Sequence, residues 1–289
     1  MEDFGLLRDA GRRVQVRVCG AAEGELVVYF HGSPSSRLDI DYLDERSQDR
    51  GVVLAGFDRP GFGGSDVHVF DFTSVAADAC AVADRVGAET FSVAGASSGT
   101  GFALATAYHY PERVRSVAVS GARGWFEPGT GGWDQLSADD QRGVLLIGTD
   151  DEEAERLLSS GDSPYEAALA LDDDALIAWW REKCSPADQR TLDTGFGPYL
   201  ATTMRESLRS GGVGWSREDV VRMGRWPFDL GEVGCPVAVW LGEQEADAAD
   251  RAAWFTSRLP NVTAHVVPDR GHFVTFDDWD LILDSLATS

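Results

Sequence analysis

The residues FSVAGASSGTG, at positions 91–101, decide the fold. The apolar run 91–94 predicts a strand buried on both faces, because central strands of parallel sheets lack polar alternation. The small residues from Gly101 to Tyr110 predict a helix that Pro111 ends. Between strand and helix lies the pattern G-x-S-x-G, which places a serine on a tight turn.

Two serines compete for the central position of this turn. A residue on so tight a turn adopts a strained backbone conformation, and the residues two before and two after it must be tiny. Ser97 has Gly95 and Gly99 at those positions, whereas the corresponding neighbours of Ser98 are an alanine and a threonine. We therefore predict that Ser97 is the reactive residue.

Strand-like and helix-like segments alternate on both sides of this turn. Further strands are predicted at 13–19, 26–30, 52–57, 114–119, 236–241 and 262–267. Further helices are predicted at 73–86, 248–259 and 274–286. Strands joined by helical crossovers predict an α/β fold, in which helices flank a mostly parallel central sheet.

From about residue 123 to residue 225 the strand-like runs stop and helix-start signals take their place. Ser163 and Ser185 are each followed by a proline and, three residues on, by an acidic side chain, as at helix N-termini. Ser216 with Asp219 predicts another helix start. We interpret this stretch as a helical insertion.

A reactive serine needs a base to accept its proton, and a histidine oriented by a carboxylate is the usual solution. Of the five histidines, His272 lies on a glycine turn between the last predicted strand and the last predicted helix. His68 and His109 lie too early in the chain for the order Ser, acid, His, and His265 lies inside a strand. We predict that His272 is the base.

The orienting carboxylate is expected between these two residues in the chain, at a strand end on the same edge of the sheet. The residues WLGEQE, at 240–245, end the penultimate predicted strand. We predict that Glu245 is this carboxylate, with Asp247 as the alternative.

The residues FHGSP, at 30–34, follow an early predicted strand. In acyl transfer, backbone N–H groups of such a loop and of the residue after the nucleophile stabilise the oxyanion. Here these would be the N–H groups of Ser33 and Ser98. His31 would then brace the loop rather than act as a second base.

With these elements in this order, the chain resembles the α/β-hydrolase superfamily over residues 5–122 and 226–289. The residues FDRPGFGGS, at 57–65, are similar to the D-R-P-G-x-G-x-S segment of many members. Residues 226–236 resemble the return from lid to core in members related to prolyl iminopeptidases and small-molecule esterases. The resemblance implies an α/β-hydrolase core at 1–122 and 226–289 and a helical cap at 123–225.

Three positions bear on the branch of the superfamily. The acid position usually holds Asp, and Glu245 is one methylene longer but can orient a histidine in the same way. Residues 98–101 read Ser-Gly-Thr-Gly where many members have Gly-Gly or Met-Gly-Gly, so Ser98 and Thr100 would add polar groups near the site. The nucleophile position holds Ser rather than Asp, which argues against the dehalogenase and epoxide hydrolase branches.

The resemblance implies a serine hydrolase without cofactor or metal, which cleaves an ester, lactone or amide bond of a small apolar or aromatic molecule through an acyl-enzyme on Ser97. Two alternatives remain open. The same residues could support acyl transfer, cyclisation or a lyase reaction, or the fold could serve as a weakly catalytic ligand receptor. Six of the nine tryptophans lie between residues 125 and 226, where they would form the cap's own core, line the pocket, or both.

The charge and the cysteines exclude other classes. The 25 basic against 48 acidic residues, a net charge of −23, argue against nucleic acid and anionic membranes as partners. The four cysteines are widely spaced, which excludes C-x-x-C metal or redox motifs, and Cys19 and Cys80 are predicted to be reduced and buried. We expect a small-molecule substrate, and the sequence leaves the oligomeric state open.

Targeting signals are not found in the sequence. No apolar run approaches the roughly 20 residues that a membrane span needs, and the N-terminus lacks the features of a signal peptide, so we expect a cytoplasmic protein.

The acidic residues concentrate in one stretch. Residues 133–175 hold 13 acidic side chains against two arginines. Those at 150–153 and 172–174 predict helix starts, where negative charge favours the helix dipole. The stretch also predicts a preference for neutral or cationic substrates over anionic ones.

Overall fold

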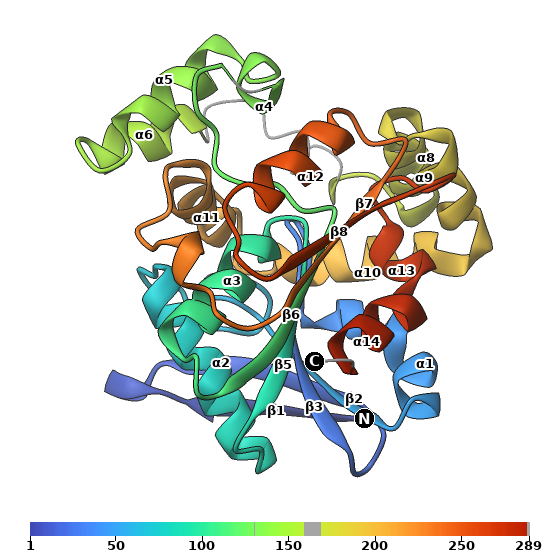
Figure 1. The fold of residues 1–289 in the computed structure, drawn as a ribbon. Helices are drawn as coiled ribbons and strands as arrows, with labels where there is room; N and C mark the ends of the chain where they lie inside the picture. Colours follow the sequence, from blue (N-terminus) through green and yellow to red (C-terminus); the bar gives the residue numbers. More distant parts are fainter. Residues whose placement is uncertain (130, 159–168, 288–289) are drawn as a thin grey trace.

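The central sheet has the strand order β1-β2-β4-β3-β5-β6-β7-β8 (Figure 1). The computed structural model describes residues 1–129, 131–158 and 169–287. Its strands are β1 (Glu2–Leu7), β2 (Arg13–Gly20), β3 (Glu25–Phe30), β4 (Val52–Phe57), β5 (Phe91–Ala96), β6 (Val114–Ser120), β7 (Val237–Gly242) and β8 (Val262–Val267). The pairs β1·β2 and β2·β4 are antiparallel, and every other neighbouring pair is parallel. The predicted α/β fold class and the predicted strands are confirmed.

β1 was not predicted from the sequence. It is an edge strand whose residues alternate between exposed and half-buried, and only Phe4 and Leu6 pack on the core. The alternation of this strand is difficult to recognise in the sequence because Gly5 has no side chain.

Helices cover both faces of the sheet. Figure 1 shows α2 and α3 on one side of the sheet and α1 and α14 on the other. Phe102 and Phe255 belong to the apolar core of the first face, and Trp279 to that of the second. The helices are α1 (Asp44–Asp49), α2 (Phe72–Val86), α3 (Gly99–His109), α12 (Ala248–Thr256), α13 (Val274–Asp277) and α14 (Trp279–Ala287). The helix predicted at 274–286 is therefore two helices, which separate at Asp278.

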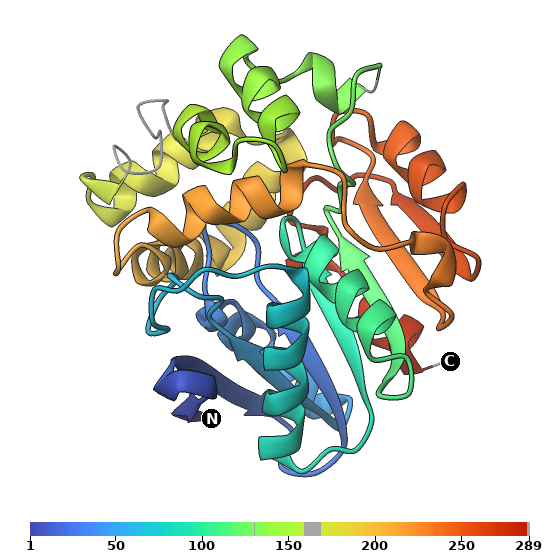
Figure 2. The same ribbon diagram turned by 90° about the vertical axis from the view of Figure 1, so that its left-hand side faces the viewer.

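Between β6 and β7, the residues that the structure describes form helices and no strands. In Figures 1 and 2 these helices lie together over one end of the sheet. The α-helices among them are α4 (Gly131–Asp134), α5 (Ala138–Leu146), α6 (Asp151–Leu158), α8 (Asp173–Lys183), α9 (Pro186–Thr191), α10 (Gly197–Ser207) and α11 (Val213–Met223). We call residues 123–225 the insertion.

The predicted helix starts in the insertion have different outcomes. The Ser185 hydroxyl accepts a hydrogen bond from Asp188 N at 3.2 Å and begins α9, as predicted. The acidic residues at 151–153 and 172–174 lie at the starts of α6 and α8, as predicted. The start predicted at Ser216 is wrong, because α11 begins at Val213. The start predicted at Ser163 lies outside the described residues.

The insertion has an apolar cluster of its own and is also fastened to the sheet. Trp133, Val144 and Met223 form that cluster. The N-terminus of α11 meets the turn after β4 backbone to backbone, since a Cβ on Gly61 would lie 2.7 Å from the Cα of Gly214. Glycine at both positions therefore allows the two segments to approach this closely.

Cys19 and Cys80 are free and buried, as predicted. Among the described residues, the helices lack the combined length and apolar character that crossing a bilayer would require.

Candidate active site

Ser97 lies on the turn between β5 and α3. Its φ is +50°, and its N–H donates to the Ser120 carbonyl at 2.8 Å. A Cβ on Gly95 would lie 2.8 Å from the Gly99 carbonyl oxygen, and one on Gly99 would lie 2.3 Å from the Phe30 carbonyl oxygen. Close contacts within this turn therefore require glycine at both positions. This requirement is the one that favoured Ser97 over Ser98 in the sequence.

His272 and Glu245 come together from two loops at the same edge of the sheet. Glu245 follows β7, and His272 follows β8. The Glu245 Oε2 lies 2.8 Å from His272 Nδ1, and its Oε1 accepts the Gly242 N–H at 2.9 Å. The Glu245 side chain is 6% exposed, whereas that of His272 is 44% exposed. The carboxylate is thus held inside the protein while the imidazole faces the solvent-accessible cavity.

The pKa values of this pair move apart. Burial would raise the pKa of Glu245, but His272, Arg251 and the Gly242 N–H together lower it to about 2. Loss of water would lower the pKa of His272, but the hydrogen bond and charge of Glu245, with the charge of Asp188, hold it above its ordinary value. The carboxylate is therefore ionised at neutral pH and favours a proton on Nδ1.

Arg251 is a partner of this pair that the sequence did not reveal. Its guanidinium lies 3.0 Å from Glu245 Oε2 and donates to the Ala122 carbonyl at 3.1 Å. Asp247, the alternative acid, instead pairs with Arg123 at 3.0 Å and with Arg251 at 3.3 Å. Of the two candidate acids, the structure therefore brings Glu245 to His272.

A cavity of about 350 Å³ joins these residues. Ser97, Ser98, Glu245 and His272 line it together with side chains of the insertion. Gly121 lies under the imidazole, since a Cβ there would be 2.9 Å from His272 Cε1. Ser97 and His272 therefore face one space, which is large enough for a small molecule.

The loop after β3 lies beside Ser97. A Cβ on Gly32 would lie 3.3 Å from Ser97 Cβ, which places the predicted oxyanion loop next to the serine. The Arg59 Nη2 donates to the hydroxyls of both predicted oxyanion residues, Ser33 at 3.3 Å and Ser98 at 3.4 Å. One guanidinium thus links the loop after β3 to the turn that carries Ser97 and Ser98.

Arg59 pairs with a glutamate of the insertion. Its Nε donates to Glu218 Oε2 at 2.6 Å, and both side chains are fully buried. The Ser33 hydroxyl donates to the other oxygen of Glu218, and Arg59 also donates to the His31 carbonyl at 2.8 Å. Because Glu218 belongs to α11, the predicted oxyanion loop is held in part by the insertion.

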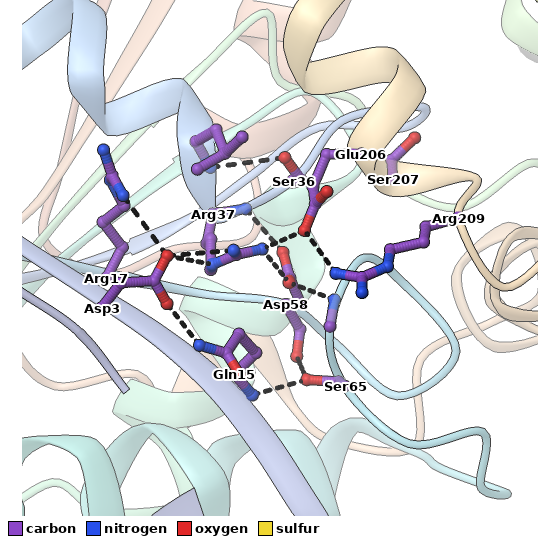
Figure 3. Close-up of polar contacts among 12 residues, drawn as sticks. Asp3, Gln15, Arg17, Ser36, Arg37, Asp58, Ser65, Glu206, Ser207 and Arg209 are labelled. Atoms are coloured by element: carbon purple, nitrogen blue, oxygen red, sulfur yellow. Dashed lines mark hydrogen bonds and ion pairs between the residues drawn. The ribbon is translucent and has the colours of Figure 1, made fainter. Parts of the chain in front are cut away.

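The preceding residue, Asp58, anchors the same turn in a second network (Figure 3). Asp58 Oδ2 lies 2.7 Å from Arg37, and the same guanidinium nitrogen lies 2.7 Å from Glu206 of α10. Figure 3 also shows Arg37 directed toward Asp3 of β1, at 3.0 Å. Asp58 and Arg59 therefore connect the turn after β4 to two different helices of the insertion.

Beside the cavity of about 350 Å³, which we call the larger lobe, a smaller apolar lobe of about 70 Å³ also borders Ser97 and His272. Ser97 and His272 line this lobe as well, with Trp180, Phe196, Leu200 and four further apolar side chains from the core. Those four are Pro34, Ala96, Phe273 and Phe276. Trp180 of the insertion lines the small lobe, and Trp226, the first residue after the insertion, lines the large one. Ser97 and His272 thus stand at the junction of an apolar and a polar space.

Asp188 of α9 reaches the loop that carries His272. Its Oδ1 accepts the Phe273 N–H at 2.8 Å, and its Oδ2 accepts the Ser185 hydroxyl at 2.7 Å. The sequence indicated only a capping role for this residue. Its contact with the histidine loop depends on how the insertion folds over the sheet.

The remaining candidates lie outside the cavity. His31 is fully buried, with Nδ1 2.7 Å from the Gly32 carbonyl oxygen, and burial and the charge of Arg59 lower its pKa. Thr100 is buried and does not line the cavity, whereas Ser98 does. Across residues 1–129, 131–158 and 169–287, no group of three or more His, Cys, Asp or Glu residues is arranged to hold a metal ion.

The sequence pattern of the alpha/beta hydrolase fold family matches residues 25–278. A comparison with curated protein sequences gives no significant match. Among solved structures, a hydrolase from Pseudomonas aeruginosa is similar at a TM-score of 0.70 and 15% identity, over 100% of this chain and 99% of that one. An esterase from Exiguobacterium antarcticum is similar at 0.67 and 17%, over 99% and 98%. A bromoperoxidase from Bacillus anthracis is similar at 0.70 and 16%, over the full length of both chains.

Proposed function

The chain belongs to the alpha/beta hydrolase fold family, and from this premise we propose that it is a serine hydrolase that cleaves carboxylic esters of small molecules. The observation that carries the proposal is the His272–Glu245 contact of 2.8 Å, in a cavity that Ser97 also lines from a turn with positive φ. A serine, an imidazole and a buried ionised carboxylate are the groups that acyl transfer through a covalent intermediate requires.

In the proposed mechanism, the Ser97 Oγ attacks the carbonyl carbon while its proton passes to His272 Nε2. Glu245 accepts a hydrogen bond from the Nδ1–H of His272 and stabilises the imidazolium that forms. The backbone N–H groups of Ser33 and Ser98 hold the oxyanion. Collapse of this intermediate breaks the bond to the alcohol, which leaves with the proton from Nε2. Water then repeats the sequence on the acyl-enzyme and releases the carboxylic acid.

The two lobes suggest how an ester would lie. We place a short acyl group in the 70 Å³ apolar lobe, which adjoins Ser33 of the proposed oxyanion loop. The alcohol part would then occupy the 350 Å³ lobe. We also propose that the insertion, residues 123–225, acts as a cap over the core of residues 1–122 and 226–289, because its side chains line both lobes.

Fluorophosphonate labelling tests the nucleophile. We expect covalent labelling of the wild-type protein on Ser97 and none of Ser97→Ala, with hydrolysis of 4-nitrophenyl butyrate lost in parallel. Labelling that survives in Ser97→Ala would refute the assignment. Absence of both labelling and hydrolysis in the wild type would instead favour a ligand-binding role for the fold.

Acyl transfer is the second candidate, because it uses the same acyl-enzyme and the larger lobe has room for an acceptor other than water. Product analysis with and without an added alcohol or amine distinguishes the two reactions. The 44% exposure of His272 favours hydrolysis, since water can reach the imidazole.

A further inference from the structure

The larger lobe is lined by an excess of positive side chains, although the whole chain is strongly negative. The chain carries a net charge of −23. The residues lining this lobe nevertheless include four cationic side chains and only two carboxylates. The cations are Arg123, Lys183, Arg222 and Arg251, and the carboxylates are Asp188 and Glu245.

Both carboxylates are already satisfied by the protein. Glu245 is bonded to the Gly242 N–H and contacts His272 and Arg251. Asp188 accepts from the Phe273 N–H and the Ser185 hydroxyl. Glu245 is therefore balanced by Arg251, while Asp188 is held by the Phe273 N–H and the Ser185 hydroxyl and its charge acts on the neighbouring His272.

The three arginines are also balanced. Arg123 pairs with Asp247, Arg251 with Glu245, and Arg222 with Asp219. Each pair fixes a guanidinium in the wall but adds little net charge to the lobe.

Lys183 is different. In the part of the chain that the structure describes, its ammonium group has no ion pair with a carboxylate and no hydrogen bond to another residue. Its Nζ lies 4.4 Å from the centre of the Trp179 ring, a cation–π contact that holds the ammonium in place without neutralising it. Lys183 is also the only lysine of the chain.

We propose that Lys183 binds a carboxylate on the alcohol part of the substrate, so that the natural substrate is an anionic ester. The catalytic half of this inference rests on the proposed function. The inference reverses the expectation from the acidic composition, which predicted a preference against anions. A distant charge is screened over about 8–10 Å at physiological salt, whereas Lys183 lines the lobe itself.

Paired substrates test the inference by kinetics. 4-Carboxyphenyl butyrate and 4-carbamoylphenyl butyrate differ mainly in charge, and each variant is characterised by the ratio of their kcat/KM values. We expect Lys183→Met to lower this ratio about fivefold to tenfold, as for loss of a charge-assisted contact at a partly exposed site. The matched control is Arg181→Gln, which removes a cation from the same helix. Arg181 does not line the lobe and pairs with Asp193. An unchanged ratio in Lys183→Met, or an equal fall in Arg181→Gln, would overturn the proposal.

Binding gives a second readout that does not need turnover. Reductive methylation with ¹³C-formaldehyde keeps the positive charge and labels one lysine, whose NMR signal is assigned by its loss in Lys183→Met. We expect 4-hydroxybenzoate, but not 4-hydroxybenzamide, to shift this signal, and 1 M NaCl to weaken the effect. If neither ester is hydrolysed but the shift appears, the proposed function fails and the carboxylate site stands. If the esters are hydrolysed and the shift is absent, the site fails and the proposed function stands.

Discussion

The two walls of the larger lobe are built in different ways. The sheet wall carries Ser97, Glu245 and His272 on loops that leave the carboxyl ends of three strands in the parallel part of the sheet, β5, β7 and β8. The insertion wall carries Lys183 and Asp188 on helices joined through irregular segments. Strand order and register fix the first wall, while the second depends on how helices pack over it. We therefore expect changes in the sheet wall to affect the chemical step and changes in the insertion wall to affect positioning, stability and substrate choice.

The largest effect is expected in the sheet wall at Ser97. Ser97→Ala should lower kcat for 4-nitrophenyl butyrate by about 10⁴-fold or more, as for removal of a nucleophile from a triad. Its control is Ser98→Ala, which keeps the proposed oxyanion N–H and loses only a 3.4 Å contact with Arg59. We expect Ser98→Ala to retain activity within about tenfold. Comparable losses in both variants would contradict the choice of Ser97.

The next effect separates the two candidate acids. Glu245→Gln keeps the shape but removes the ionised acceptor of the Nδ1–H, so kcat should fall by about 10³- to 10⁴-fold. Asp247→Asn removes the negative charge that pairs with Arg123 and Arg251. Since this charge does not contact His272, kcat should fall by less than about tenfold. Steady-state kinetics of both variants at one pH would decide between them. A larger loss in Asp247→Asn would transfer the role to that residue.

The difference between the walls also explains what the sequence could predict. The sequence could place Ser97, Glu245 and His272 at one edge of the sheet because each lies within five residues after a strand whose apolar run is visible in the sequence, and parallel strands end at a common edge. Arg59 was visible in a motif, but its partner Glu218 was not, because a helix of the insertion could present any of its faces to that turn. The cap of α11 was placed four residues late, at Ser216 instead of Gly212, for a related reason. The side chain of Ser216 binds back to the Gly212 carbonyl, so it lies inside the helix that it seemed to cap.

A smaller effect tests where the walls meet, at the buried Arg59–Glu218 pair. Glu218→Gln leaves the guanidinium without its buried counter-charge, so the free energy of unfolding should fall by about 3–5 kcal/mol. Since Glu218 also accepts from the Ser33 hydroxyl, we expect kcat to fall by about tenfold to a hundredfold.

The matched control for this pair is Glu206→Gln in the neighbouring network. Glu206 is 19% exposed and shares Arg37 with Asp58, so its loss should cost about 0–1 kcal/mol. Urea unfolding and kcat are measured on the same preparations. If Glu218→Gln were as stable and active as Glu206→Gln, the insertion would not help to hold the oxyanion loop.

The smallest effect is expected at Asp188, where the insertion wall approaches His272, the proposed base. His272 can accept the proton of Ser97 only when its imidazole is neutral, so activity should fall as the pH drops through its pKa. The negative charges of Glu245 and Asp188 raise that pKa, while Arg251 lowers it. Asp188→Asn removes one of the two charges that raise it but keeps an oxygen for the Phe273 N–H. The acid limb of kcat/KM should therefore move to lower pH, while the value on the alkaline plateau changes by less than about threefold. A limb that stays in place with a lowered plateau would mean that Asp188 only supports the loop, and the insertion would then have no electrostatic part in the chemistry.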